Sequence, residues 1–455
     1  MSKLLHCPWL LGPHGWQPDV LLQLDEHGHI AAMGTGADER ALRLPGPVLP
    51  GMVNVHSHAH QRLMAGLSGR RARGEDSFWS WREQMYAAIA LLSPEELALL
   101  ATWLYMELLE GGYTTQGEFH YPHRLAGQAP EASSAALIRA AEQAGCALTL
   151  LPVWYRYAGF GRQAPTPAQQ GFILDAAAFQ ALIERLEAQI EPVSLLRIGL
   201  APHSLRAVDV TELAELLTRL PGRPVHIHIA EQPAEVQACL TAHGRRPIQL
   251  LAEHVRLDQG WCLIHATHID EQELAIAAAA DVVIGLCPTT EADLGDGLFP
   301  AAEWLSAGGR FAIGSDSNLH TSAAAELRLL EWTQRLRRHG RNVLIGPQGG
   351  HIGSALWAQT AAAGARALGQ PCGNLAPGHR ADLVVLEPSH PLLAGLSPAA
   401  MLDTWIMAEQ PGMLNQVWVA GQCLVDKGRH RHRASLQRDF VALRGRLAAA
   451  TGMGA

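Results

Sequence analysis

Two histidines spaced by one residue follow a short apolar run near the start of the chain. The run Met52-Val-Asn-Val55 has the β-branched, apolar character of a buried strand, and His56 and His58 come at its end. Because side chains alternate along a strand, residues two apart leave it on the same face. Two neutral imidazoles that converge in this way supply half of the ligands of a zinc site. The spacing therefore predicts a metal site at the end of this strand.

The same His-x-His spacing recurs elsewhere in the chain, so the spacing alone does not distinguish this pair. Its position at the end of the first strand of a β/α series does. Between residues 51 and 318, short apolar segments alternate with alanine- and leucine-rich helical segments. Strands are expected at 51–58, 114–120, 146–155, 196–204, 224–231, 260–268, 281–288 and 310–318. Eight strands alternating with helices predict an α/β fold, the (β/α)8 TIM barrel, whose active site lies at the carboxyl ends of the strands.

Further candidate ligands come at the ends of two other predicted strands. The strand 224–231 ends in His228-x-x-Glu231, so that His228 can join the first two histidines on a metal while Glu231 carries a proton. Asp316 ends the eighth strand, where an oxygen ligand would complete the site. A lone aspartate after a strand is commonly a helix N-cap. Its place at a barrel strand end favours the ligand interpretation.

Strand-like segments at both chain ends predict a second, smaller domain. They are a hairpin at 18–33 and later strands at 381–386, 416–421 and 422–425. We expect residues 1–48 and 370–433 to form one composite β-sandwich that flanks a barrel of residues 49–369. Residues 434–455 have the pattern of a C-terminal helix.

Composition excludes several classes of protein. The 455 residues are 48% hydrophobic and 17% charged, which is typical of a globular enzyme, and the net charge of −8 argues against nucleic acid or an anionic membrane as partner. The seven cysteines are scattered, with no Cys-x-x-Cys, so neither a disulfide framework nor a cysteine zinc site is indicated. A reduced, cytoplasmic enzyme fits this composition.

The strand-end residues resemble the amidohydrolase superfamily. Its motifs match at the ends of strands one, five, six and eight: His56, His58, His228, Glu231, His265 and Asp316. The match continues into the flanking domain, at Gly378–Leu386 and Val417–Gly421. Within the superfamily the chain is similar to the deaminase and chlorohydrolase branch, and there it resembles the formiminoglutamate deiminases of histidine degradation.

The resemblance implies a role for each matching residue. The implied metal ligands are His56, His58, His228 and Asp316. Glu231 takes the place of the general acid and base, and His265 takes the place of the histidine that, with Asp316, orients the attacking water. His268 lies close in the sequence and is expected to be structural.

The resemblance also bears on the number of metal ions. Relatives with two metals usually bridge them with a carboxylated lysine, or sometimes a carboxylate, on the fourth strand. The segment Leu196–His203 contains neither, and the only lysines of the chain are Lys3 and Lys427. We therefore expect one divalent metal per chain, with zinc first and with iron and manganese also suited to nitrogen and oxygen ligands.

Several residues near the strand ends are candidates for binding substrate. Glu291 stands where heterocycle deaminases of this branch usually have asparagine, and a carboxylate there suits a cationic formimino group. Arg82 and Arg206 are expected to bind carboxylates, which a neutral base would not require. Further hydrogen bonds are expected from Gln61, Tyr121 and His203.

The resemblance implies hydrolysis of N-formimino-L-glutamate to N-formyl-L-glutamate and ammonia by a homodimer that binds a small dicarboxylate. An alternative is an aminohydrolase or chlorohydrolase acting on a heterocycle such as guanine or a triazine. A third interpretation is a barrel that has become a non-enzymatic scaffold. Such a barrel should have lost ligands, and this chain has all of them.

Overall fold

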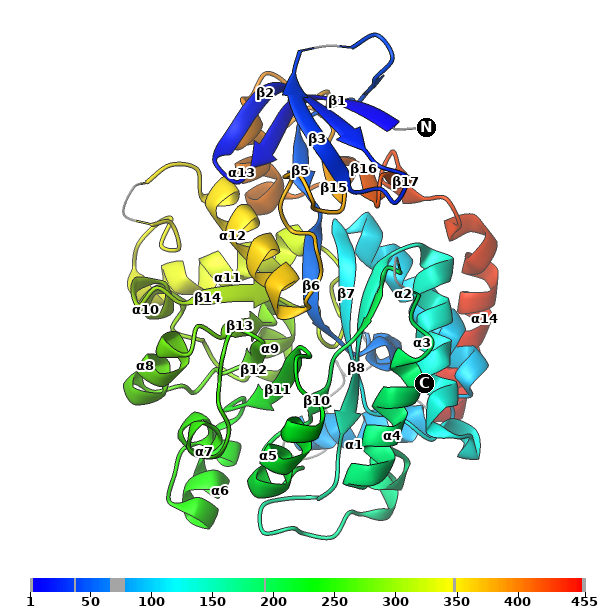
Figure 1. The fold of residues 1–455 in the computed structure, drawn as a ribbon, viewed down its shortest axis with the longest axis vertical. Helices are drawn as coiled ribbons and strands as arrows, with labels where there is room; N and C mark the ends of the chain where they lie inside the picture. Colours follow the sequence, from blue (N-terminus) through cyan, green and yellow to red (C-terminus); the bar gives the residue numbers. More distant parts are fainter. Residues whose placement is uncertain (1–2, 37, 66–77, 192–193, 347–348, 452–455) are drawn as a thin grey trace.

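Two β-sheets, one above the other in Figure 1, organise the molecule. The computed structural model describes residues 3–36, 38–65, 78–191, 194–346 and 349–451, without the side chains of residues 78–81 and 451. Within these ranges, every helix is too short or too polar to span a bilayer.

The lower sheet is a closed parallel barrel. Its strands are β6 (Met52–Ser57), β7 (Tyr113–His120), β8 (Ala147–Trp154), β9 (Leu196–Ile198), β10 (Ala201–Pro202), β11 (Val225–Ile229), β12 (Trp261–His265), β13 (Val283–Leu286) and β14 (Arg310–Ile313). They pair in the order β10-β8-β7-β6-β14-β13-β12-β11, β9 pairs with β8, and a parallel bridge between Leu200 and Val225 joins the two ends. The predicted (β/α)8 barrel is confirmed, with the fourth strand divided into β9 and β10.

Helices surround the barrel on its outside (Figure 1). They are α2 (Pro94–Glu110), α3 (Pro130–Ala144), α4 (Ala176–Glu187), α5 (Val210–Arg219), α6 (Pro233–His243), α7 (Pro247–His254), α8 (Glu271–Ala279), α9 (Pro288–Leu294), α10 (Ala301–Ser306), α11 (Ala323–Arg338) and α12 (Ile352–Ala367). Side-chain caps fix several starts, such as the capping box of Ser93 and Glu96 at α2. Because helices cover the outer face and side chains fill the inside, β6, β7 and β8 are buried along their whole lengths.

The upper sheet is built from both chain ends, which confirms the predicted second domain. Its strands are β1 (Lys3–Gly12), β2 (Gly15–Leu24), β3 (Ile30–Thr35), β4 (Leu42–Arg43), β5 (Val48–Pro50), β15 (Leu383–Leu386), β16 (Leu414–Val419), β17 (Gln422–Asp426) and β18 (Arg429–His430). They form one hydrogen-bonded sheet in which β5 pairs with both β1 and β15. The sequence patterns did not predict β1, since Pro8 and Asp19 interrupt its ladder with β2.

Two connections fix the upper sheet to the amino ends of the barrel strands. Gly51 leads directly from β5 into β6, and a Cβ atom there would lie 2.3 Å from the Thr114 hydroxyl oxygen. Arg380 is buried, pairs with Asp382 at 2.7 Å, and donates a hydrogen bond of 2.7 Å to the Thr115 hydroxyl on β7. The carboxyl ends of the barrel strands therefore lie away from this sheet.

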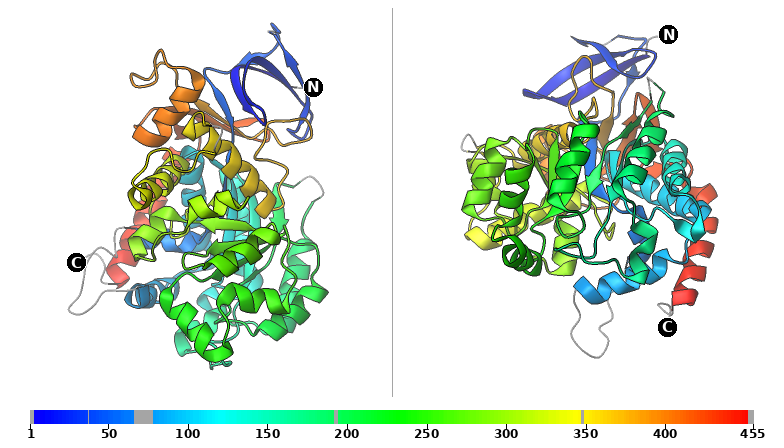
Figure 2. Two further views of the ribbon diagram at one scale, coloured as in Figure 1. Left: turned by 90° about the vertical axis from the view of Figure 1, so that its left-hand side faces the viewer. Right: turned by 60° about the horizontal axis from the view of Figure 1, so that its bottom comes forward.

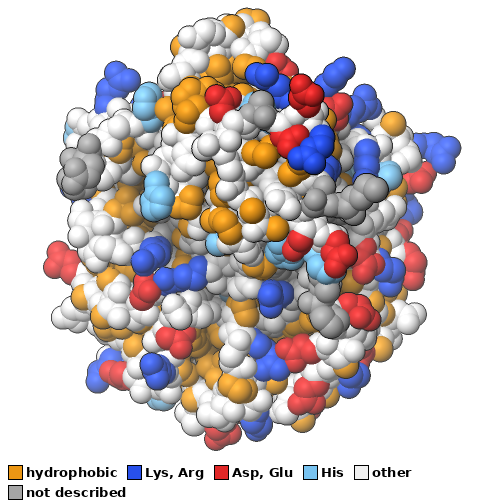
Figure 3. All heavy atoms as spheres, turned by 45° about the horizontal axis from the view of Figure 1, so that its top comes forward, with side chains coloured by type: hydrophobic (Ala, Val, Ile, Leu, Met, Phe, Trp, Pro, Cys, Tyr) orange, Lys and Arg blue, Asp and Glu red, His pale blue; other side chains and the backbone are white. Residues whose placement is uncertain are grey.

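The helix α14 (Arg433–Thr451) lies along the outside of the barrel in both views of Figure 2, with Phe440 stacked on Trp103 of α2. On the face shown in Figure 3, basic and acidic side chains are interspersed, and the described part of this face has no continuous basic patch.

Candidate active site

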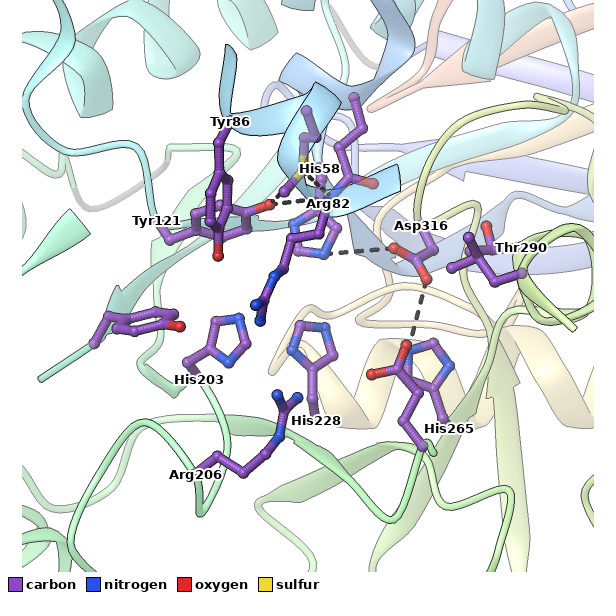
Figure 4. A pocket seen from close by; sticks show the side chains of 15 residues that line it. His58, Arg82, Tyr86, Tyr121, His203, Arg206, His228, His265, Thr290 and Asp316 are labelled. Atoms are coloured by element: carbon purple, nitrogen blue, oxygen red, sulfur yellow. Dashed lines mark hydrogen bonds and ion pairs between the residues drawn. The ribbon is translucent and has the colours of Figure 1, made fainter. Parts of the chain in front are cut away.

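Three histidines and one aspartate from the ends of three strands converge at the carboxyl end of the barrel. Figure 4 shows three of them, His58, His228 and Asp316. His56 lies in β6 and His58 directly follows it, His228 lies in β11, and Asp316 follows β14. The histidine ring nitrogens that could bind an ion lie within 4.8 Å of one another. The Nε2 atom of His56 is 3.0 Å from that of His228, and the Nε2 atom of His58 is 3.4 Å from Asp316 Oδ1. The structure therefore brings together all four predicted ligands.

The chemistry of these donors fits a divalent metal. His58 donates its Nδ1 hydrogen to the Phe119 carbonyl at 2.8 Å, which leaves the Nε2 lone pair for an ion. Burial lowers the pKa of His58 to about 3, and burial with neighbouring imidazoles lowers the pKa of His56 and His228 well below its usual value. Neutral imidazoles are the form that binds metal, and three nitrogens with one carboxylate suit zinc.

Two asparagines tie the strands that carry the ligands. The ladder between β6 and β14 has a single residue pair, supplemented by one isolated bridge. Asn318 donates from Nδ2 to the carbonyl oxygens of His58 at 3.0 Å and Asp316 at 2.9 Å. Asn54 donates to the Ser315 hydroxyl at 2.7 Å and accepts from the Ser315 N–H at 2.9 Å. Side-chain amides thus supplement a short backbone ladder next to the ligands.

Ionisable groups suited to proton transfer lie beside the ligands. The Nε2 atom of His265, at the end of β12, is 3.9 Å from Glu231 Oε1 and 3.6 Å from Asp316 Oδ2. Burial opposes a charge on His265, but the surrounding carboxylates, led by Glu231, raise its pKa to about 10. Burial raises the pKa of Asp316 to about 7, against the influence of His265. The arrangement provides a proton acceptor and an imidazole that both face the same space.

A pocket with about 560 Å³ of empty space opens onto this group. Its lining residues are His58, Gln61, Arg82, Met85, Tyr86, Tyr121, Tyr155, His203, Arg206, His228, Glu231, His265, Thr290, Leu294 and Asp316. The lining includes all of the predicted substrate-binding residues except Glu291. Figure 4 shows Arg82 and Arg206 reaching into the pocket from opposite sides, with His203 and His228 between them.

Neighbouring groups set the charge and orientation of the pocket side chains. Burial opposes the charge of Arg206, but the carboxylates of Glu235 and Glu231 raise its pKa. The Tyr121 hydroxyl accepts a hydrogen bond of 3.1 Å from Gln61 Nε2. The pocket therefore offers cationic and neutral donors, as a carboxylate-bearing substrate would require.

Glu291 departs from its predicted position against substrate. It lies in the first turn of α9, where its Oε1 atom is 3.1 Å from His265 Nδ1. The packing of α9 turns the side chain towards the back of the His265 ring instead of into the pocket. His268, expected to be structural, contacts the Asp296 carbonyl from its Nε2 atom at 2.8 Å.

Five lining residues were not among the predicted site residues: Met85, Tyr86, Tyr155, Thr290 and Leu294. Met85 and Tyr86 follow Arg82 by three and four positions on α1 (Phe78–Ile89), so helical spacing from Arg82 could have found them. Tyr155 directly follows β8, so its place at a strand end was a further signal.

Comparison with known proteins agrees with this geometry. The model of the Amidohydrolase family matches residues 48–424. Formimidoylglutamate deiminase from Pseudomonas aeruginosa is 46% identical over 96% of this chain and 97% of that protein. An 8-oxoguanine deaminase from the same organism is 28% identical, over 75% of this chain and 74% of its own length.

Solved structures share the whole fold. The crystal structure of an amidohydrolase from Brucella melitensis has a TM-score of 0.92 and 41% identity, covering 98% of this chain and 99% of its own. A zinc complex of atrazine chlorohydrolase from Arthrobacter aurescens has a TM-score of 0.82 at 21% identity, covering 97% of this chain and 100% of its own, a likeness of fold alone. With the family model matching most of its length, this chain belongs to the amidohydrolase family.

Proposed function

We propose that the protein is a metal-dependent deiminase that hydrolyses N-formimino-L-glutamate to N-formyl-L-glutamate and ammonia. The observation that carries the proposal is the pair Arg82 and Arg206, which both line a pocket that Glu231 and His265 also line. A substrate with two carboxylates matches two guanidinium groups, whereas a neutral heterocycle requires neither. The name of the 46% identical relative supports the same substrate.

We propose that His56, His58, His228 and Asp316 hold one divalent ion, with zinc first among the candidates. When bound, such an ion supplies a Lewis acid that lowers the pKa of water towards ~7. A single ion is supported by the absence of any lysine between Lys3 and Lys427, so that no carboxylated lysine can bridge two ions. Elemental analysis of active protein should find one metal per chain, and two tightly held metals would contradict this stoichiometry.

The protein side chains have separate tasks in the proposed reaction. Glu231 accepts a proton from the attacking water, whose oxygen adds to the formimino carbon, while His265 and Asp316 orient that water. Glu231 then donates that proton to the departing nitrogen and accepts the proton of the added hydroxyl group, which it returns to solvent. The carbon–nitrogen bond breaks, and ammonia leaves as the formyl carbonyl forms. The two arginines hold the substrate carboxylates, which aligns the formimino carbon with the attacking oxygen.

Ammonia release from purified, metal-loaded protein tests the substrate. We expect turnover of N-formimino-L-glutamate and none of guanine, 8-oxoguanine or a triazine at equal concentration. The heterocycles are included because an 8-oxoguanine deaminase is among the relatives. Turnover of a heterocycle without turnover of the formimino substrate would replace the proposal with the aminohydrolase alternative.

We further propose that the enzyme is a cytoplasmic homodimer that serves histidine breakdown. Seven free thiols, six of them buried, suit a reducing compartment. The superfamily resemblance supports the dimer. Light scattering of purified protein should give the mass of two chains, and a single-chain mass would contradict this assembly.

A further inference from the structure

One oxygen of Glu291 is held at two points behind the active site. Its Oε1 atom accepts a hydrogen bond of 2.9 Å from the Cys287 N–H, at the junction between β13 and α9. The same atom lies 3.1 Å from Nδ1 of His265, so that the ring nitrogen donates to it. The Glu291 side chain is 8% exposed, and the residue does not line the pocket. Its carboxylate is therefore fixed against the back of the His265 ring.

The opposite edge of the same ring faces the reacting groups. Nε2 of His265 points towards Glu231 Oε1 at 3.9 Å and Asp316 Oδ2 at 3.6 Å, and His265 itself lines the pocket. One face of the ring lies nearly parallel to His228, with an interplanar angle of 13°. The His265 backbone is in the left-handed region, with φ of 68°, so strand geometry alone does not direct the ring.

We propose that Glu291 is a positioning residue that acts through His265. By accepting the Nδ1 hydrogen, it fixes the plane of the ring so that Nε2 meets the water shared with Glu231 and Asp316. Carboxylates that accept a hydrogen bond from the far nitrogen of a functional histidine commonly hold its ring in a fixed orientation. The inference deepens the proposed deiminase function and rests on it for the identity of the reaction.

The geometry favours this role over direct binding of a cationic substrate group. A carboxylate that binds substrate must line the pocket, whereas Glu291 is not a lining residue and its Oε1 atom is engaged by both Cys287 and His265. The influence of Glu291 on the reaction therefore passes through the imidazole ring. Removing it should change how fast bound substrate reacts more than how tightly substrate binds.

A double-mutant cycle tests the proposal with metal-loaded full-length protein. Glu291→Gln should lower kcat about 10- to 100-fold, the usual loss for a second-layer partner, with KM and metal content unchanged. His265→Asn alone should cost at least as much. In the His265→Asn background, adding Glu291→Gln should cost no more than about twofold, because the partner through which Glu291 acts is already gone.

Glu326→Gln is the matched control. Glu326 of α11 is also a buried carboxylate, and it accepts a hydrogen bond of 2.9 Å from the Thr289 N–H, in the same turn of α9. It does not pair with His265 among the described contacts. We expect this variant to keep kcat within about twofold, and any effect it has should be the same with His265 present or replaced.

Two outcomes would overturn the proposal. A rise in KM at unchanged kcat would mean that Glu291 binds substrate, and additive losses in the cycle would mean that it only supports the fold. If Glu291→Gln does not fold, histidine ring ¹⁵N NMR of the unsubstituted protein decides instead. A hydrogen on His265 Nδ1 with the downfield shift of a hydrogen bond to a carboxylate supports the proposal. An Nδ1 that is unprotonated, or whose hydrogen exchanges freely with solvent, contradicts it.

Failure of the proposed function would look different. In that case the unsubstituted enzyme would release no ammonia from N-formimino-L-glutamate. The double-mutant cycle would then be measured with the heterocycle that the enzyme turns over. The NMR measurement needs no substrate, so its result would still test the position of Glu291.

Discussion

Glu231 is the residue at which metal binding and proton transfer can be separated. It lines the pocket beside the ligand group without belonging to the predicted ligand set. Glu231→Gln keeps the size of the side chain but removes the proton acceptor, so we expect kcat to fall about 10²- to 10⁴-fold while elemental analysis finds the same metal content. Glu253→Gln, on the surface of α7, is the control and should be silent. Near-normal kcat at full metal content would move the proton shuttle to another group.

Arg82 and Arg206 carry the substrate assignment, and each can be replaced by methionine. Leaving a desolvated carboxylate unpaired costs about 2–5 kcal/mol, a factor of roughly 30 to several thousand in kcat/KM. The loss should shrink for a formamidine without carboxylates, because that substrate leaves no charge unpaired. Arg223→Met, which removes an ion pair with Glu187 outside the pocket, should affect both substrates little. Equal losses on charged and uncharged substrates would show that the two arginines are structural.

Single residues differ in how far sequence alone could place them. The alternation of a strand fixes the common direction of His56 and His58, and the strand-end rule of a barrel then collects His228 and Asp316 around them. No such rule exists for Glu291. Its direction depends on how the short helix α9 packs after β13, which is a tertiary property.

At the level of elements, the side chain of Asn318 helps to hold the strands β6 and β14 together. Asn318→Asp exchanges the amide donor for a carboxylate that repels the His58 and Asp316 carbonyl oxygens. The ligands should lose their fixed spacing, so we expect zinc affinity to fall about 10- to 100-fold in competition with a chelator.

Asn342→Asp is the control for backbone conformation. Asn318 and Asn342 both have a left-handed backbone, with φ of 59° and 51°, but Asn342 lies on a loop after α11. Its variant should bind zinc normally. Unchanged zinc affinity in Asn318→Asp would show that the backbone ladder alone holds the two strands.

The elements themselves were predictable where burial dominates. Most barrel strands are apolar runs between turn signals, and all eight predicted strands are present. The break between β9 and β10 depends instead on Gly199, where a Cβ atom would lie 2.6 Å from a Leu151 methyl group and 2.8 Å from the Pro224 carbonyl. A close approach of this kind is invisible in the order of residues.

For the molecule as a whole, Arg380 tests whether the two domains are one cooperative unit. Its guanidinium is buried between Asp382, Gln370 and Thr115. Arg380→Met therefore leaves the Asp382 carboxylate buried without its ion-pair partner. Removing one partner of a buried pair costs about 3–5 kcal/mol. We expect the free energy of unfolding, measured with urea, to fall by that amount, and unfolding to remain a single transition.

Arg366→Met is the control. It removes a more exposed ion pair with Asp281 and should lower the free energy of unfolding by about 1 kcal/mol or less. Separate unfolding steps for barrel and upper sheet in the Arg380 variant would contradict a cooperative unit.

The pairing of β5 with β15 has a consequence for synthesis on the ribosome. Pro50 leaves the ribosome about 330 residues before Leu383, its partner in the ladder. At ~5–20 residues per second, β1 to β5 wait roughly 15–70 s for the strands that complete their sheet. The barrel, whose strands all lie between them, can close during this interval. The first strands to be made are thus among the last to be fully paired, and meanwhile their open edge is a natural substrate for a chaperone.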